Sequence, residues 1–207
     1  KRLHPGGAHL EHDRQRFLAE AVVTGDLDHP NIVPVHDLAA TQDGTPFYAM
    51  KLVRGRSWDA VIDDLGDDEN LDILLKVADA VAFAHSRGVI HRDLKPQNVM
   101  LGDFGEVLVM DWGLAASVTD TAKASRLDER SAFGGTAAYM PPEMAMGSME
   151  RIGTASDVYL LGAVLFRLLT GRTPHDGASV MACLTAAAQN TIVATPRSDE
   201  FVSIALE

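Results

Sequence analysis

The chain has 207 residues, of which 46% are hydrophobic and 23% charged, and its formal net charge is −11. This composition is typical of a folded globular protein and excludes a disordered chain. The acidic balance, without a long basic run, argues against nucleic acid as a partner, because phosphate contacts need clustered Lys and Arg. The single cysteine, Cys183, excludes an intrachain disulfide and a cysteine metal cluster. The sequence contains no run of about 18 apolar residues, so no membrane-spanning helix is predicted.

The first fifty residues predict a helix followed by a β-hairpin. Apolar residues recur at helical spacing over 13–24, and Gly25 is the expected end of that helix. A turn signal at 42–45 separates two β-prone runs, 33–39 and 47–53, which predicts a hairpin. By composition alone, Glu20 is an ordinary solvated carboxylate on the helix.

The middle of the chain predicts two helices and several short strands. Residues 72–86 place apolar side chains on one face and predict an amphipathic helix. The acidic run 67–70 before it is expected to be a solvated loop. The remaining elements expected in this part are a short helix over 57–65, a strand over 89–90, a loop over 91–98 and a hairpin of strands 99–101 and 107–110.

The last third predicts a flexible loop and then helices. Residues 114–135 mix charged, Ser and Thr residues without a clear period and predict the loop. Residues 155–169 form the most apolar helical stretch and are expected to be a buried helix, with Asp157 at its start and Gly171 at its end. A further helix is expected over 179–189, and another one begins at 199.

The stretch His91-Arg92-Asp93-Leu94-Lys95-Pro96-Gln97-Asn98 carries the groups that phosphoryl transfer needs. A carboxylate can orient the attacking hydroxyl, an amide or carboxylate oxygen can hold magnesium, and a cation can stabilise the charge on the moving phosphoryl group. Pro96 excludes a helix interior, so the stretch is expected to be a loop. It resembles the catalytic loop of protein kinases.

Other motifs extend this resemblance in the same order along the chain. They are Lys1, Glu20, Asp93 to Asn98, Asp111-Trp112-Gly113, Thr136, Pro142-Glu143 and Asp157. The chain therefore resembles the bacterial-type serine/threonine protein kinases over nearly its whole length. The resemblance implies an α+β, two-lobed fold that is incomplete at both ends. Residues 1–53 would be the remnant of a small β-rich N-lobe, and 54–207 a mainly helical C-lobe without its last helices.

The resemblance also implies roles for the catalytic and nucleotide-binding residues. Asp93 would orient the substrate hydroxyl, and Lys95 would neutralise the γ-phosphate. Asn98 and Asp111 would hold Mg²⁺, and Lys1 would contact the nucleotide phosphates while paired with Glu20. Between the lobes, Met50 would be the gatekeeper, and the Lys51 carbonyl and Val53 amide would face the adenine of ATP.

Two Asp-aromatic-Gly segments compete for the role of metal-binding motif. Asp103-Phe104-Gly105 lies only five residues after Asn98, between two predicted strands, so the resemblance places it in a hairpin loop. Asp111-Trp112-Gly113 follows the second strand of that hairpin, where the family has its metal ligand. Trp112 departs from the family's Phe but keeps a large apolar side chain, and Gly113 completes the motif.

The remaining family positions imply regulation and structural support. Arg92 beside the catalytic Asp implies that phosphorylation of the 114–135 loop switches the activity on or off. Autophosphorylation is expected between Ser117 and Ser131. Thr136 and Glu143 belong to the end of the activation segment, and Asp157 is expected to hold the backbone of the catalytic loop. In the family, Glu143 pairs with a downstream arginine, for which the chain offers no candidate.

The implied function is ATP-dependent phosphorylation of serine or threonine on protein substrates, with ATP and Mg²⁺ as cofactors and a cytoplasmic location. The chain is expected to be either free or the cytoplasmic domain of a longer membrane-anchored protein. A pseudokinase or scaffold, and a small-molecule phosphotransferase, are the alternatives. The Gly-rich phosphate loop belongs upstream of Lys1, and Lys1 is expected to fray, so these 207 residues alone are expected to be a poor enzyme.

Overall fold

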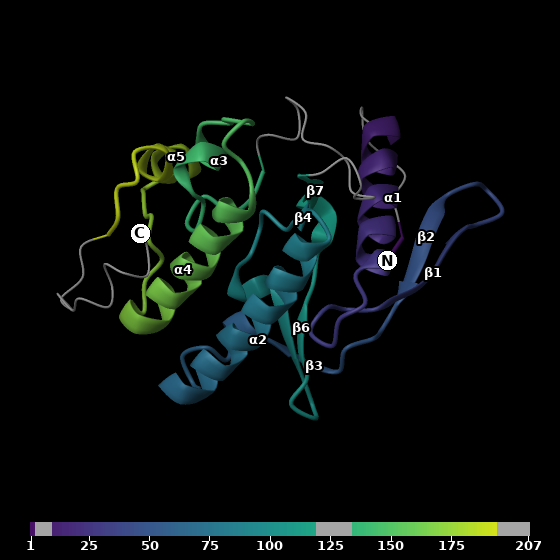
Figure 1. Cartoon of the computed structure of the whole chain (residues 1–207), viewed down its shortest axis with the longest axis horizontal. Coiled ribbons are helices and arrows are strands. Elements are labelled where there is room, and N and C mark those ends of the chain that lie inside the picture. The colour runs from purple at the N-terminus through teal and green to yellow at the C-terminus, as the bar shows by residue number, and fades with distance from the viewer. Residues whose placement is uncertain (3–9, 119–133, 194–207) are drawn as a thin grey trace.

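The computed structural model describes residues 1–2, 10–118 and 134–193, without the side chains of 10–13 and 16. It has an α+β fold with a small sheet-rich part at one end and a larger, mainly helical part (Figure 1). This arrangement confirms the predicted fold class. No helix within the described ranges is long and apolar enough to cross a membrane.

The described helices are α1 (Leu10–Asp26), α2 (Asp67–Ser86), α3 (Pro142–Ala145), α4 (Thr154–Thr170) and α5 (Val180–Ala188). The strands are β1 (Val35–Ala40), β2 (Pro46–Met50), β3 (Gly55–Ser57), β4 (Val89–Ile90), β5 (Val99–Gly102), β6 (Val107–Val109) and β7 (Ala116–Ser117). Three 3-10 turns complete the set: η1 (Trp58–Ala60), η2 (Pro96–Asn98) and η3 (Trp112–Leu114).

The small part combines α1 with the antiparallel hairpin of β1 and β2, seen at the right of Figure 1. Strand alternation turns Tyr48 inward, where it packs with Phe17 and Ala21 of α1 in a separate small core. The ring centroids of Phe17 and Tyr48 lie 5.1 Å apart. At the other edge of β2, Arg2 pairs with Phe47, so the start of the chain extends this sheet.

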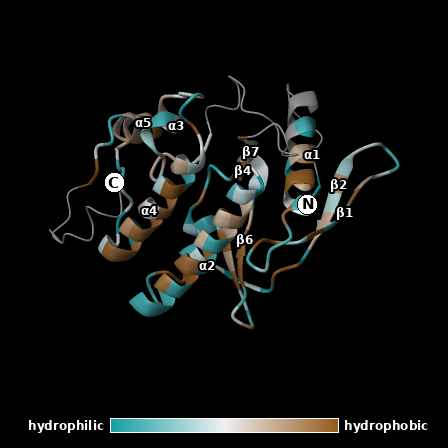
Figure 2. Ribbon diagram, viewed as in Figure 1, coloured by the Kyte–Doolittle hydropathy of each residue, from teal (hydrophilic) through white to brown (hydrophobic). Residues whose placement is uncertain are grey.

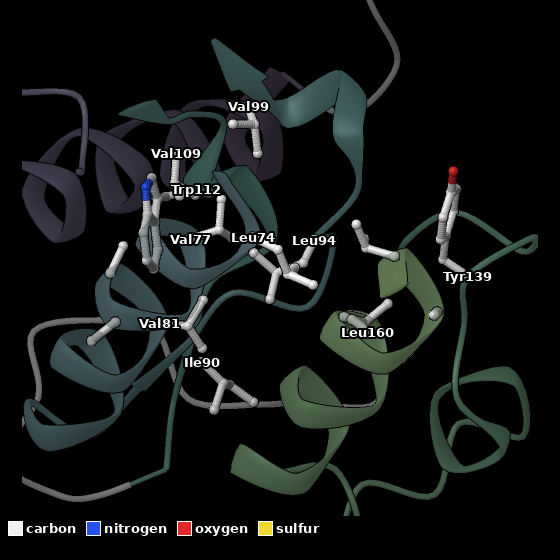
Figure 3. Packing of buried hydrophobic residues seen from close by; sticks show 14 of the residues in the cluster. Leu74, Val77, Val81, Ile90, Leu94, Val99, Val109, Trp112, Tyr139 and Leu160 are labelled. Carbon is white, nitrogen blue, oxygen red and sulfur yellow. The ribbon is translucent and has the colours of Figure 1, made fainter. Parts of the chain in front are cut away.

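The larger part is built around the contact between α2 and α4. Apolar residues of α2 at helical spacing, Leu74, Val77 and Val81, enter one continuous core with Leu160 of α4 and Leu94 of the 91–98 loop (Figure 3). The short sheets β3-β5-β6 and β4-β7 complete this part of the fold. Figure 2 shows that α4 is largely apolar along its length. Its Val158 is nevertheless 60% exposed, so the helix is not buried all round as predicted.

The region between the hairpin and α2 differs from the prediction. Instead of a helix over 57–65, the chain forms only η1 followed by turns. The amide of the buried Asn70 bonds the carbonyls of Ile62 and Leu65, and its oxygen accepts from the Trp58 indole. These bonds stabilise the turns in place of a helical hydrogen-bond ladder.

The acidic run 67–70 is the first turn of α2, not a solvated loop. Asp67, Asp68 and Glu69 lie at the N-terminus of this helix, where the helix dipole favours negative charge. The prediction was wrong because it read the run as charged surface and overlooked its value as a helix start.

Other boundaries shift by a few residues. Helix α1 continues through Gly25 to Asp26, so this glycine is not the helix stop. Strand β2 ends at Met50, and residues 51–54 have no regular structure. The predicted loop 114–135 begins with ordered backbone, because Ala116 and Ser117 form β7 against β4. The helix expected from 199 lies outside the described residues.

Candidate active site

A buried carboxylate, Glu20, organises the first half of the site. Its oxygens lie 2.7 and 3.0 Å from the Lys1 Nζ, and the Tyr48 hydroxyl donates to it at 2.7 Å. The backbone also holds Lys1, whose terminal ammonium donates to the Tyr48 carbonyl and whose own carbonyl accepts from the Tyr48 amide. The expectation that Lys1 frays was therefore wrong, because pairing with β2 orders it.

The protonation of this cluster follows from its contacts. Burial alone would lower the pKa of Lys1, but the hydrogen bond and negative charge of Glu20, together with Asp111, outweigh it and raise that pKa. Burial, then Glu20, raises the pKa of the Tyr48 hydroxyl. Lys1 is therefore charged and Tyr48 neutral across the physiological range.

Asp111 joins the same cluster from the other side. Its Oδ1 lies 3.3 Å from the Lys1 Nζ, and its side chain is 55% exposed. The following Gly113 leaves room for the two carboxylates, since a Cβ there would lie 3.3 Å from both Asp111 Oδ1 and Glu20 Oε2. The structure thus brings together Lys1, Glu20 and Asp111, which lie up to 110 positions apart in sequence.

The second half of the site is the catalytic loop, and Asp157 fixes its backbone. One carboxylate oxygen of Asp157 accepts from the Arg92 amide and the other from the His91 amide, each at 2.8 Å. The second oxygen also accepts from His85 Nε2 at 2.8 Å. These bonds hold Arg92 in a left-handed conformation, with φ 72°, that is unfavourable for a bulky residue.

The hydrogen bonds of His91 define its tautomer. Its Nδ1 accepts from the Asp93 amide at 3.2 Å, so the ring proton is on Nε2, which donates to the Met110 carbonyl at 3.1 Å. The Trp112 ring packs against it, with centroids 4.6 Å apart, and is 1% exposed. Residues His91 and Trp112 therefore join the catalytic loop to the segment that carries Asp111.

Asp93 is held in place by three side chains. Its Oδ1 accepts from the Thr136 hydroxyl at 2.8 Å, and its Oδ2 from Lys95 Nζ at 2.7 Å. Lys95 also donates to Thr136 at 2.6 Å, and the Asn98 amide donates to Asp93 Oδ2 at 3.1 Å and to the Asp93 carbonyl at 2.8 Å. The structure thus gathers Asp93, Lys95, Asn98 and Thr136 into one network.

The structure gives fewer contacts for the other predicted site residues, which are Met50, Lys51, Val53 and Arg92. Met50 packs on the small core around Tyr48, and the Lys51 amide donates to the Pro34 carbonyl at 3.0 Å. Within the described ranges, no protein hydrogen bond uses the Lys51 carbonyl or the Val53 amide. The buried Arg92 donates to the Leu114 carbonyl at 3.2 Å.

Within these ranges the Lys51 carbonyl and the Val53 amide thus keep their hydrogen-bonding capacity for another partner. Among the expected phosphorylation sites, Ser117 is buried in β7, and those over 119–131 lie outside the described residues.

Glu143 has a partner other than the arginine expected from the family. It is half-buried, and its Oε1 accepts from the Ser156 hydroxyl at 2.6 Å. Ser156 also accepts from the Gly153 amide, so it links α3 to the first turn of α4. The sequence argument looked only for an arginine and missed this hydroxyl.

Sequence reasoning also missed Tyr48 and His85. Tyr48 contacts the buried Glu20 and His85 contacts the buried Asp157, but a residue 28 positions from Glu20 or 72 from Asp157 leaves no local signal. Strand alternation does not reveal Tyr48 either, because the neighbouring Phe47 and Ala49 on the opposite face are also apolar.

The oxygens present suit a hard cation such as magnesium. Asn98 uses its amide nitrogen toward Asp93, which leaves its Oδ1 as an acceptor, and Asp111 keeps one oxygen away from Lys1. Across the described ranges, no group of three or more His, Cys, Asp and Glu could hold a metal alone. Magnesium in phosphotransferases is held by one or two protein oxygens together with phosphate and water, which fits this pair.

The site combines a lysine–glutamate pair in one part of the fold with an Asp–Lys–Asn loop in the other. A family model described as "Protein kinase domain" matches residues 5–203. The chain belongs to the protein kinase family.

Its relatives include bacterial serine/threonine kinases. It is 36% identical over 195 residues to "Serine/threonine-protein kinase PknD" of Protochlamydia amoebophila. This match covers 80% of this chain and 20% of that protein. It is 38% identical over 170 residues to "Probable serine/threonine-protein kinase PknB" of Lactococcus lactis, covering 81% and 26%. "Serine/threonine-protein kinase PrkC" of Bacillus subtilis is 36% identical over 170 residues, with coverage of 81% and 25%. The matched part is thus about a fifth to a quarter of these relatives' length.

Proposed function

We propose that the protein transfers the γ-phosphoryl group of ATP to serine or threonine hydroxyls of protein substrates. The observation that carries this proposal is the Asp93 network. Its Oδ1 already accepts a hydrogen bond from an aliphatic hydroxyl, that of Thr136, at 2.8 Å. A substrate hydroxyl needs the same bond to be oriented for attack and to lose its proton.

In this mechanism, Asp93 accepts the proton of the attacking hydroxyl while the new oxygen–phosphorus bond forms and the bond to the leaving phosphate oxygen breaks. Lys95, 2.7 Å from Asp93, stabilises the negative charge of the transferred group. Asn98 and Asp111 would hold Mg²⁺, which neutralises phosphate charge when bound.

Lys1 positions the nucleotide phosphates on the other side of the site. Its pairing with Glu20 fixes the direction of the ammonium, and Asp111 at 3.3 Å connects it to the metal ligands. The open Lys51 carbonyl and Val53 amide would bind the adenine edge, next to Met50. We place the lobe boundary between 53 and 54, since β3 at 55–57 pairs with β5 of the larger part. ATP supply favours a cytoplasmic location.

The test is phosphorylation of a serine peptide and a threonine peptide by the full-length protein with labelled ATP. Asp93→Asn should lower the rate by about 10²- to 10⁴-fold, because it removes the group that accepts the proton, while ATP binding is retained. Asp103→Asn is the matched control, since this exposed carboxylate lies in the β5–β6 turn, and it should keep the full rate.

The alternative of a binding module without turnover makes the opposite prediction. If the unmodified protein binds ATP but transfers no label to any protein or peptide, the proposed catalysis is wrong. Transfer at a normal rate by Asp93→Asn would instead refute the role of this residue.

A further inference from the structure

Two large apolar side chains are exposed in neighbouring segments of the chain. Phe104, in the turn between β5 and β6, is 95% exposed, and Leu52 is 81% exposed. The Asp103 amide of that turn donates to the Arg54 carbonyl at 3.1 Å, which holds the turn against the segment that carries Leu52. Single exposed apolar side chains are ordinary on a protein surface, but a group of them marks an interaction site.

Two exposed arginines, Arg54 and Arg56, follow Leu52 in the same segment. Among the described residues, no ion pair or side-chain hydrogen bond uses either guanidinium. We call Leu52, Arg54, Arg56 and Phe104 the arginine patch. With the exposed Asp103 counted, this patch is still net positive, although the whole chain has a formal net charge of −11. It therefore favours a partner surface that is both apolar and acidic.

The acidic segment, residues 64–71, has the opposite charge and an apolar component of its own. Four of its eight residues are acidic and none is basic. In the part of the chain that the structure describes, these exposed carboxylates form no ion pair; they are Asp64, Asp67, Asp68 and Glu69. The helix dipole explains the three acids in the first turn of α2. It does not explain Asp64, which precedes the helix, or Leu71, which is 45% exposed.

The arginine patch and the acidic segment lie on the same side of the molecule. Only residues 57–63 separate Arg56 from Asp64, and η1 within that stretch contacts β5. Figure 1 shows the N-terminal end of α2 and the turn between β5 and β6 at the same lower end of the molecule. Two copies related by a two-fold axis can therefore place each arginine patch against the acidic segment of the other copy.

We propose that the protein forms a two-fold dimer in which each arginine patch binds the acidic segment of the second copy. The contact buries Phe104 and Leu52 against Leu71 and pairs the two arginines with the exposed carboxylates. A second copy fits better than an unrelated partner, because one chain carries both complementary surfaces on one side. The like net charges of the two copies oppose association. At physiological salt, however, charges more than about 8 Å apart are largely screened, so the local contacts decide.

Sedimentation equilibrium of the 207-residue chain at physiological salt tests the dimer without reference to catalysis. We expect reversible dimers whose fraction rises with protein concentration. Phe104→Ala should weaken dimerisation by about tenfold or more, as for an aromatic anchor at the centre of an interface. Val180→Ala shortens an equally exposed type of side chain on α5 and is the matched control, which should have no effect. A chain that stays monomeric at every concentration, or equal effects of the two variants, overturns the proposal.

Charge reversal identifies the two surfaces that meet. One variant combines Arg54→Glu with Arg56→Glu, so that both of its surfaces are acidic. The other combines Asp64→Lys, Asp68→Lys and Glu69→Lys, so that both of its surfaces are basic. Each variant alone should dimerise about tenfold or more weakly than the unmodified chain, because like charges face one another. An equimolar mixture should form mixed dimers with about the affinity of the unmodified chain, since both contacts then pair opposite charges.

The control for the change in net charge is Arg151→Glu, at an exposed position outside both surfaces, which should dimerise normally. Thermal melts verify that each variant is folded. A folded mixture that forms no mixed dimers refutes the pairing of the two surfaces. If the chain stays monomeric but sediments with phosphatidylserine vesicles, and Phe104→Ala does not, the arginine patch is a membrane-binding surface and the proposed dimer is wrong.

Discussion

Two regions of the molecule are each built around one buried carboxylate, and they hold it differently. Asp157 in the helical part accepts from two backbone amides and from His85. Glu20 in the small part accepts from the side chains of Lys1 and Tyr48. Backbone donors cannot rotate away, whereas the Lys1 side chain is flexible and 44% exposed.

The difference has a consequence for each region. The catalytic loop is a fixed part of the folded core, because its strained backbone at Arg92 depends on Asp157. The Lys1 and Glu20 side chains can separate without unfolding the chain, because the backbone bonds between Lys1 and Tyr48 do not depend on this pair. Substitution of Asp157 should therefore lower the stability of the fold, and substitution of Glu20 should weaken ligand binding.

The largest effect is expected for Asp157→Ala. The variant leaves the His91 and Arg92 amides buried without an acceptor, at about 1–3 kcal/mol each. We expect the free energy of unfolding to fall by about 3–5 kcal/mol, measured by urea denaturation. Asp157→Asn keeps one acceptor oxygen and should lose less. Asp72→Ala, on the exposed side of α2, serves as the control, and an equal loss there would contradict the anchoring role.

Next is Asp111, which lies between the two regions. Asp111→Ala should weaken magnesium-dependent ATP binding by about tenfold or more, because a hard cation loses one of its few protein oxygens. Stability should change little, since the side chain is 55% exposed. Calorimetric titration with and without Mg²⁺ measures this, with Asp103→Ala as the matched control. Equal losses in the two variants would show that the wrong Asp-aromatic-Gly segment was chosen.

Glu20→Gln should affect binding more than stability. Removal of the charge leaves Lys1 only its longer contact with Asp111, at 3.3 Å. We expect ATP to bind about three- to tenfold more weakly, with a loss of about 1 kcal/mol or less in unfolding free energy. Tyr48→Phe distinguishes the contribution of Tyr48 from that of Lys1, since it removes one hydrogen bond to Glu20 and keeps the ion pair. A stability loss as large as that of Asp157→Ala would remove the distinction between the regions.

The sequence was sufficient to predict residues that belong to an ordered set of motifs. It did not predict residues whose role depends on a contact with a distant part of the chain. The apolar faces of α2 and α4 and the chain order of Asp93, Asn98 and Asp157 were sufficient for the fold class and the family, and the roles of these three residues stay predictions. The acidic start of α2 was misread because Asp67 to Glu69 suit a solvated loop and a helix N-terminus equally well.

The missed partners share a physical cause. Tyr48, His85 and Ser156 each bond a carboxylate that lies elsewhere in the sequence, and hydroxyls and imidazoles have no pattern that announces such a bond. The turns after η1 depend on the amide of Asn70, which no local propensity predicts. Hydrogen bonds between side chains that lie far apart in the sequence are therefore the part of this structure that the sequence did not predict.

The smallest expected effect concerns a tyrosine of the helical part. Burial, then the negative charge of Glu143, raises the pKa of Tyr159 to about 12. Because the neutral form is favoured in the folded state, its contribution to stability is complete below pH 10, the ordinary pKa, and is lost as the pH rises toward 12. Absorbance at about 295 nm follows tyrosinate formation, and Tyr159→Phe should remove a titration centred near pH 12. If the variant instead removes a titration near pH 10, the hydroxyl is solvated, and its bonds to His175 and Asn190 do not hold this end of α4 in solution.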